Sequence, residues 1–344
     1  MNIYPNLILE ALTEIHYPAE KQNIVESGMV EDDIRIDGNK VSFSLISPKQ
    51  NSPFMKSVVK ASIAAIKRHA GDDCEVTILV KNRETQPKPV KSSPIEAAKI
   101  VAISSGKGGV GKSTVSSNLA VALAKQGYSV GLLDADIFGP SIPKMFGVED
   151  YRPELAIVGD RNLMQPAEKF GVKLLSIGFF VDPNNAVVWR GMMAGNAIKQ
   201  LVEEANWGKL DYFLVDLPPG TSDIHLTIVD VLKFTGAIIV STPQSVAIAD
   251  VIKGIEMFEN PKINVPILGL VENMAYFTPE ELPDNKYYIF GREGVKRFAE
   301  ERGVPLLAQI PVIQSICESS DDGTPEVLKN PLLEEKYLEI IEKI

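Results

Sequence analysis

The sequence predicts an α/β fold in which a doubly wound, mostly parallel sheet follows a small N-terminal α+β domain. After residue 99, apolar runs of strand length alternate with helical patterns, as in a parallel sheet that helices cover on both faces. Residues 81–99 read KNRETQPKPVKSSPIEAAK, a proline-containing segment with little to bury, which is typical of a linker. We therefore predict a domain over residues 1–82, a linker over 83–98 and a second domain over 99–344.

The composition is that of an ordinary globular protein, with 45% hydrophobic and 23% charged residues among 344. The net charge is -10, because 45 acidic residues outnumber 35 basic ones, and no basic patch is evident. We therefore expect neither nucleic acid nor a membrane surface as a partner. Two cysteines and the lack of a signal-peptide pattern in Met1–Pro18 make the cytoplasm the expected compartment.

Short apolar patterns predict the elements of the first domain. Residues 33–46 (DIRIDGNKVSFSLI) form two alternating runs around an Asp-Gly-Asn turn, which is a hairpin signal. Helical spacing of apolar residues over 7–15 and again from 54 to 66 predicts two helices, and residues 74–80 alternate like a strand. Nothing in these residues predicts chemistry.

Buried strands recur through the second domain. Each is a continuous apolar run, and such runs indicate strands whose two faces are both covered. The expected strands cover residues 100–103, 130–133, 213–215, 237–240 and 267–271.

A glycine-rich loop follows the first of these strands. The sequence GKGGVGKST satisfies G-x-x-x-x-G-K-[ST] between a strand and a helix, the context in which this motif binds phosphate. Its glycines let backbone N–H groups approach phosphate oxygens, while Lys112 is placed to reach the β- and γ-phosphates and Ser113 to ligate Mg²⁺. The alternative, a glycine turn that binds nothing, is disfavoured by the complete motif. The expected ligand is a nucleoside triphosphate, bound by Gly106, Lys107, Gly108, Gly109, Val110, Gly111, Lys112, Ser113 and Thr114.

Three aspartates follow buried strands. Asp134 and Asp136 lie in LLDADIFGP, and Asp216 ends DYFLVD before a Pro-Pro-Gly turn. Because ligands of open α/β sheets bind beyond the carboxyl ends of the strands, all three carboxylates are expected to point toward the phosphates. Asp216 is then the acid that holds Mg²⁺ and Asp136 the residue that orients the attacking water. The alternative is that an aspartate here only caps the segment that follows it.

The lysine at position 107 makes the loop more specific, because it resembles the additional lysine of deviant-loop ATPases, a class that includes the MinD, ParA and nitrogenase iron protein families. Within this class, residues 99 to about 327 resemble the Mrp/ApbC family of iron–sulfur cluster carrier ATPases, and residues 28–45 resemble the PaaD-like domain that precedes the ATPase in many members. The segments that carry the resemblance are DADIFGPSIP (134–143), WRGMMAGNAI (189–198), WGKLDYFLVDLPPGTSD (207–223), STPQSVAIADVIKGIEMF (241–258) and GLVENMAYF (269–277).

The resemblance implies roles for individual residues. Members of the class commonly form nucleotide-sandwich homodimers, so Lys107 would reach the γ-phosphate bound by the partner chain. Asp136 falls in the first switch and Asp216 in the second. Asn273, in VENM, resembles the adenine contact of the family, although a turn asparagine at a strand end is the alternative.

The sequence departs from the family at its expected cluster ligands. Family members carry C-x-x-C shortly after the segment that corresponds to Asn273-Met274-Ala275, whereas this chain continues YFTPEEL. The cysteine of the N-terminal module is also missing, since residues 47–53 read SPKQNSP. Cys74 begins an apolar strand and is expected to be buried, whereas Cys317 lies in a polar stretch and is expected to be exposed. The ligands of any [4Fe–4S] cluster at a dimer interface therefore stay unassigned.

Together these observations predict a homodimeric P-loop ATPase that hydrolyses ATP slowly with Mg²⁺, using Lys107, Lys112, Asp136 and Asp216. The resemblance implies that it transfers iron–sulfur clusters to apoproteins and works with cluster assembly factors. The missing cysteines favour an alternative, an ATP-switched dimeric scaffold that carries no cluster. A third interpretation, a positioning ATPase on nucleoid or membrane, is disfavoured by the acidic charge and the lack of a basic terminal helix.

Overall fold

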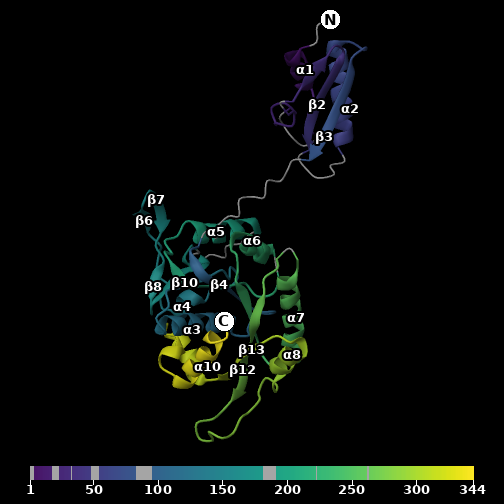
Figure 1. The fold of residues 1–344 in the computed structure, drawn as a ribbon. Helices are drawn as coiled ribbons and strands as arrows, with labels where there is room; N and C mark the ends of the chain where they lie inside the picture. The colour runs from purple at the N-terminus through teal and green to yellow at the C-terminus, as the bar shows by residue number, and fades with distance from the viewer. Residues whose placement is uncertain are drawn as a thin grey trace. The chain divides into compact units, whose positions relative to one another are not determined.

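The chain forms two compact units, Met1–Lys91 and Ser92–Ile344, in a computed structural model (Figure 1). Each unit has a hydrophobic core of its own. The structure describes residues 4–17, 23–31, 33–47, 54–82, 95–180, 191–221, 223–261 and 263–344. Most of the predicted linker, residues 83–94, and Trp189 of the family segment lie outside the described residues.

The N-terminal unit is a three-stranded sheet with two helices. The hairpin β1–β2 is antiparallel, as its Asp-Gly-Asn turn predicts, and β3 returns parallel to β2 after helix α2. Ile8, Leu12, Phe43, Leu45 and Ile66 are buried in its core. The first helix ends at Leu12, three residues before the predicted end at residue 15. The elements are α1 (Pro5–Leu12), β1 (Arg35–Asp37), β2 (Lys40–Ser47), α2 (Met55–Ala70) and β3 (Glu75–Asn82).

The second unit is built on an eight-stranded sheet in the order β13-β12-β11-β4-β10-β5-β9-β8. Every neighbouring pair is parallel except β8–β9, so the predicted doubly wound, mostly parallel sheet is confirmed. The strands are β4 (Ala97–Ser104), β5 (Val130–Asp134), β8 (Ala167–Lys169), β9 (Val172–Ser176), β10 (Leu210–Asp216), β11 (Gly236–Ser241), β12 (Ile267–Phe277) and β13 (Leu306–Val312).

The helices of this unit pack on the sheet, and a separate hairpin lies beside it. The hairpin consists of β6 (Leu155–Val158) and β7 (Arg161–Met164). The helices are α3 (Lys112–Lys125), α4 (Ile142–Met145), α5 (Gly191–Glu203), α6 (Asp223–Val231), α7 (Ser245–Glu259), α8 (Gly294–Arg302), α9 (Gln314–Asp321) and α10 (Pro331–Ile341), with 3-10 turns η1 (Ile177–Phe180) and η2 (Glu326–Leu328). Among the described helices, none is both long and apolar enough to cross a bilayer.

Two features of the sheet differ from the sequence prediction. The first strand begins at Ala97, inside the segment assigned to the linker. Strand β12 runs to Phe277 rather than to residue 271, because it continues through the polar residues Glu272 and Asn273, which pair with β13. The apolar pattern does not reveal this extension, because two polar residues interrupt the apolar run even though their side chains are buried.

The order of the sheet places the ligand site. Strand β4 lies between β10 and β11. The next strand of this sheet along the chain, β5, lies on the β10 side of β4, whereas the later strands β11, β12 and β13 lie on its other side. Such a switch point opens a crevice at the carboxyl ends of the strands. The loop after β4 and the aspartates that end β5 and β10 therefore meet at this edge.

Candidate nucleotide-binding site

The glycine-rich loop joins β4 to the first turn of α3. Gly109 and Gly111 have φ angles of 80° and 83°, in the left-handed region that side chains disfavour. A Cβ atom added to Gly106 would lie 2.3 Å from the backbone carbon of Asp250, so only glycine fits there. The loop thus requires glycine at these positions for its conformation and its close packing.

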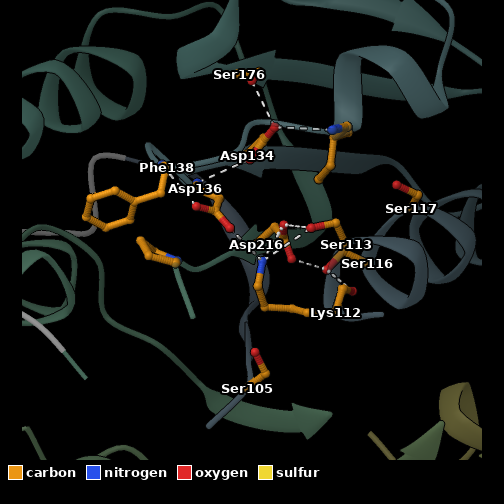
Figure 2. Close-up of polar contacts among 12 residues, drawn as sticks. Ser105, Lys112, Ser113, Ser116, Ser117, Asp134, Asp136, Phe138, Ser176 and Asp216 are labelled. Carbon is orange, nitrogen blue, oxygen red and sulfur yellow. Dashed lines mark hydrogen bonds and ion pairs between the residues drawn. The ribbon is translucent and has the colours of Figure 1, made fainter. Parts of the chain in front are cut away.

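Lys112 and Asp216 form a buried ion pair at the centre of the site (Figure 2). Lys112 Nζ lies 2.7 Å from Asp216 Oδ2, and the two side chains are 6% and 0% exposed. Ser113 Oγ donates to the same carboxylate oxygen at 2.6 Å, and Ser116 Oγ donates to Asp216 Oδ1 at 2.6 Å. Ser113 and Asp216 together present oxygen donors of the kind that Mg²⁺ prefers, so these two residues fit the metal.

Asp136 lies on the other side of Lys112. Its Oδ2 is 3.7 Å from Lys112 Nζ, and its Oδ1 accepts a hydrogen bond from the Phe138 amide at 3.1 Å. Burial raises the pKa of Asp136, and the Lys112 charge opposes that rise. Asp136 and Lys112 line a cavity of about 200 Å³ with Ser105, Gly108, Gly109, Gly111, Ser113, Thr114, Ser141, Met145 and Pro219. The loop and one of the aspartates thus share one cavity, large enough for phosphate groups.

Asp134 differs from the prediction that it points toward the phosphates. Figure 2 shows its carboxylate directed at Ser176, whose hydroxyl donates to it at 2.9 Å. It also accepts from the backbone amides of Asp136 at 3.2 Å and Ile142 at 3.3 Å. The alternative reading of this residue, a cap on the following segment, therefore describes it better. Complete burial and then the charge of Asp216 raise the pKa of Asp134 to about 7, against the opposing effect of Lys112.

Lys107 is partly exposed, in contrast to Lys112. Its carbonyl accepts a hydrogen bond from Ser105 Oγ at 2.9 Å, which fixes the backbone of the loop around it. Among the described residues, the Lys107 side chain forms no ion pair. Its action on the nucleotide of a partner chain remains a prediction.

A second cavity, of about 430 Å³, adjoins the loop at Gly111 and Thr114. Most of its lining is apolar. Asn273 contributes an amide whose Nδ2 donates to the Val110 carbonyl at 2.9 Å, and this bond fixes the orientation of the amide. The remaining lining residues are Met274, Phe290, Ile310, Pro311, Val312, Ile313, Ile316, Cys317, Ser320, Asp321 and Tyr337. We call this space the base cavity, because it lies beside the phosphate loop and suits a flat, largely apolar ring.

An irregularity in β12 shapes the wall of the base cavity. Met274 has a φ angle of 55°, and the pairing of β12 with β13 shifts register between Asn273 and Phe277. Such a bulge re-aims neighbouring side chains. The strand can therefore place both Asn273 and Met274 in the lining of one cavity, although adjacent residues of a regular strand face opposite sides.

The two cysteines have different environments. Cys74 is 2% exposed in the N-terminal core, and burial raises the pKa of its thiol. Cys317 is exposed on α9, and both cysteines are unpaired. The predicted difference in burial is thus confirmed. Among the described residues, no group of three or more His, Cys, Asp or Glu side chains is arranged to hold a metal ion.

Sequence reasoning missed several residues of the site. Ser116 was detectable, since it lies one helical turn after Lys112 and therefore on the same side of α3. Ser176 and Tyr337 gave no local signal, because they come from β9 and α10, far from the motif in sequence. Lys112, Ser113, Asp136 and Asp216 do lie together, and Asn273 adjoins the loop.

Comparisons with known proteins find relatives of both parts of the chain. Residues 96–344 match the family model described as NUBPL iron-transfer P-loop NTPase, and residues 6–78 match the one described as iron-sulfur cluster assembly protein. An iron-sulfur cluster carrier protein of Synechocystis is 40% identical over 94% of this chain and 91% of its own length.

Solved structures resemble the second unit. A nucleotide-binding protein from Archaeoglobus fulgidus in complex with ADP has 38% identity and a TM-score of 0.60, over 70% of this chain and 92% of that one. The cell-division protein MinD of Pyrococcus horikoshii, complexed with Mg-ADP, has 25% identity and a TM-score of 0.52, over 71% of this chain and 95% of that one. The chain belongs to the NUBPL/Mrp family of iron–sulfur cluster carrier P-loop NTPases, as its motifs predicted.

Proposed function

We propose that this protein binds Mg-ATP, hydrolyses it slowly and delivers iron–sulfur clusters to apoproteins. The observation that carries the proposal is the meeting of Lys112, Ser113 and Asp216 at the carboxyl edge of the sheet, in a chain of the carrier family. The nucleotide bound in the two structural relatives supports ATP as the ligand, since one contains ADP and the other Mg-ADP.

The residues of the phosphate site would have three roles, which are phosphate binding, Mg²⁺ binding and orientation of the attacking water. Lys112, which pairs with Asp216 and Asp136, would turn part of its charge to the β- and γ-phosphates of a bound nucleotide. Ser113 and Asp216 would hold Mg²⁺, which neutralises phosphate charge when bound. Asp136 would accept a hydrogen bond from the attacking water and orient it.

The base cavity favours adenine over guanine. Because Asn273 Nδ2 is engaged by Val110, the amide oxygen is left to accept a hydrogen bond from a base. Adenine presents a donor amino group where guanine presents an acceptor oxygen, so the fixed amide matches adenine. Asn273 is only 7% exposed, so an unmatched base would leave its oxygen buried without a partner.

We also propose that two chains form a homodimer around the nucleotides, with Lys107 acting on the γ-phosphate of the partner chain. Its partly exposed position in the same loop as the buried Lys112 suits a residue that meets a second molecule. A cation supplied in this way stabilises the charge that develops during phosphoryl transfer. The cytoplasm is the proposed compartment, in keeping with two unpaired cysteines.

The cluster is cargo, and this chain supplies few ligands for it. A [4Fe–4S] cluster is commonly held by four thiolates, and a homodimer of this chain has two exposed ones. We therefore propose that donor or recipient proteins contribute the other thiolates. The second candidate function, an ATP-switched scaffold without cargo, is favoured by the same shortage.

The iron and acid-labile sulfide content after anaerobic reconstitution distinguishes the two candidates. The chain is measured alone and with an apo-protein that takes a [4Fe–4S] cluster, both with and without Mg-ATP. A carrier is expected to hold iron and sulfide and to accelerate loading of the recipient. Cys317→Ala tests the exposed thiol, and Cys74→Ala is the matched control. If the chain binds no iron and does not change the rate at which the recipient acquires its cluster, the carrier function is wrong and the scaffold function remains.

A further inference from the structure

One face of α9 forms a wall of the base cavity. Ile316, Cys317, Ser320 and Asp321 all line it, and their spacing is that of one helical face. Cys317 is an exposed, unpaired cysteine, so a reagent in solvent can reach it. The one accessible thiol of the chain therefore borders the proposed nucleotide site.

The opposite side of α9 is held in place. Ser315 Oγ donates to the Glu326 carboxylate at 2.5 Å, and Ser319 Oγ donates to its other oxygen. Glu326 is buried, which makes these hydrogen bonds costly to break. The helix is thus fixed in the orientation that keeps Cys317 in the cavity wall.

A second observation indicates that the cavity takes a ligand. Tyr337 lines it and is 1% exposed, and none of the hydrogen bonds among the described residues uses its hydroxyl. A hydroxyl in a mainly apolar cavity wall can donate to or accept from the polar edge of a bound ligand. Tyr337 and Cys317 come from α10 and α9, so a single occupant of the cavity lies beside both.

We propose that Cys317 is a modification site at which thiol chemistry and nucleotide binding exclude each other. Bound nucleotide fills the cavity and shields the thiol, and a group attached to Sγ occupies the space that the base needs. The inference rests on the proposed nucleotide site and adds its regulation. The modifying agent is a low-molecular-weight disulfide.

The reaction is a thiol–disulfide exchange. Cys317 loses its proton to solvent, and the thiolate attacks one sulfur of the disulfide. A bond forms between Sγ and that sulfur while the original sulfur–sulfur bond breaks, and the other half leaves as a thiolate. Cys317 is oxidised as the leaving half is reduced, and a second free thiol reverses the exchange.

The first test measures the rate at which N-ethylmaleimide modifies Cys317, by intact mass and peptide mapping of the full chain. If nucleotide excludes the reagent, Mg-ADP at 100 times its Kd slows the reaction about 100-fold. The matched control is Cys317→Ser combined with Glu318→Cys, which moves the thiol to an exposed neighbour outside the cavity lining. Mg-ADP is expected to leave that rate unchanged. Equal slowing at both positions, or none at 317, overturns the proposal.

The second test measures ADP affinity before and after treatment with oxidised glutathione. The wild type is expected to lose binding and to regain it with dithiothreitol, whereas the affinity of Cys317→Ser does not change on treatment. If the modified wild type binds ADP as before, the inference fails while the nucleotide site stands. If neither untreated protein binds ADP or ATP, the proposed function fails, and the inference fails with it.

Discussion

The phosphate site and the base cavity adjoin at Gly111, yet they are built in different ways. The phosphate site draws its charged groups from one short motif and from the aspartates that follow two strands. Its charges neutralise one another, as Lys112 does with Asp216 and Asp136. The base cavity is mainly apolar and collects side chains from β12, β13, α9 and α10.

The difference follows from the cost of burial. A buried charge without a partner is so unfavourable that the charged side chains of the phosphate site pair with one another. A ligand there has to replace existing ion pairs. A buried amide or hydroxyl costs less, so the base cavity can keep Asn273 and Tyr337 ready for a ligand. The two sites are therefore expected to respond differently to substitution and to pH.

The largest expected effect is that of Lys112→Ala, compared with Lys107→Ala. Loss of Lys112 removes the cation that we propose to hold the phosphates, and ATP hydrolysis is expected to fall about 100-fold or more. It also leaves Asp216 buried without its cation, which costs about 3–5 kcal/mol of unfolding free energy. Lys107→Ala is expected to keep stability and ATP binding while losing hydrolysis, since Lys107 is partly exposed.

Turnover, ATP affinity and chemical denaturation of both variants check this pair. Hydrolysis by Lys112→Ala at the wild-type rate would show that the assigned phosphate site is wrong. Hydrolysis by Lys107→Ala at the wild-type rate would remove the proposed action on the partner chain.

A smaller loss of nucleotide affinity is expected for Gly111→Ala, at the boundary of the two sites. Gly127→Ala, outside both sites, is its control. Both glycines have left-handed φ angles, 83° and 88°. A Cβ at Gly111 lies 2.2 Å from Asn273 Nδ2, whereas one at Gly127 meets nothing within 4 Å. Both variants should lose about 1–2 kcal/mol of unfolding free energy from backbone strain.

Only Gly111→Ala should weaken ADP binding, by about tenfold or more, which is about 1.4 kcal/mol. Titration calorimetry with Mg-ADP measures the difference. Equal affinities of the two variants for Mg-ADP would mean that displacing Asn273 from its place beside Gly111 does not affect nucleotide binding.

The unfolding free energy is expected to change by about 2 kcal/mol with pH because of Asp134. Asp134 has a pKa raised to about 7 by burial and by Asp216, so the folded protein holds a proton that the unfolded chain has lost between about pH 4 and 7. Because the folded state binds more protons there, its stability falls as pH rises through that range. Asp134→Asn removes this dependence.

Thermal unfolding of the nucleotide-free protein at pH 5 and pH 8 tests the effect. The difference in melting temperature between Asp134→Asn and wild type is expected to shift in favour of the variant from pH 5 to pH 8. The loss of one acceptor oxygen lowers the stability of the variant equally at both pH values and does not affect this shift. Asp160→Asn, in the exposed turn between β6 and β7, serves as the control. The same relative melting temperature at both pH values would contradict the raised pKa of Asp134.

Much of the phosphate site could be predicted from the sequence, because its motif carries its own geometry. The loop from Gly106 to Thr114 sits between a strand and a helix, and Asp216 ends the strand beside it. Asp134 was misjudged because its position at a strand end does not reveal Ser176 on the neighbouring strand, which draws its carboxylate away. The boundaries of the two domains remain a prediction.

The sequence by itself determined the fold class, the family, the phosphate loop and the shortage of cysteines. These follow from local patterns, in which glycine, lysine and apolar periodicity act over a few residues. The tertiary structure alone decided what lines the base cavity, since Asn273, Cys317 and Tyr337 meet only when β12, α9 and α10 pack together. Side-chain contacts between distant segments leave no periodic trace in the chain, and so the place of Cys317 beside the proposed nucleotide site could emerge only from packing.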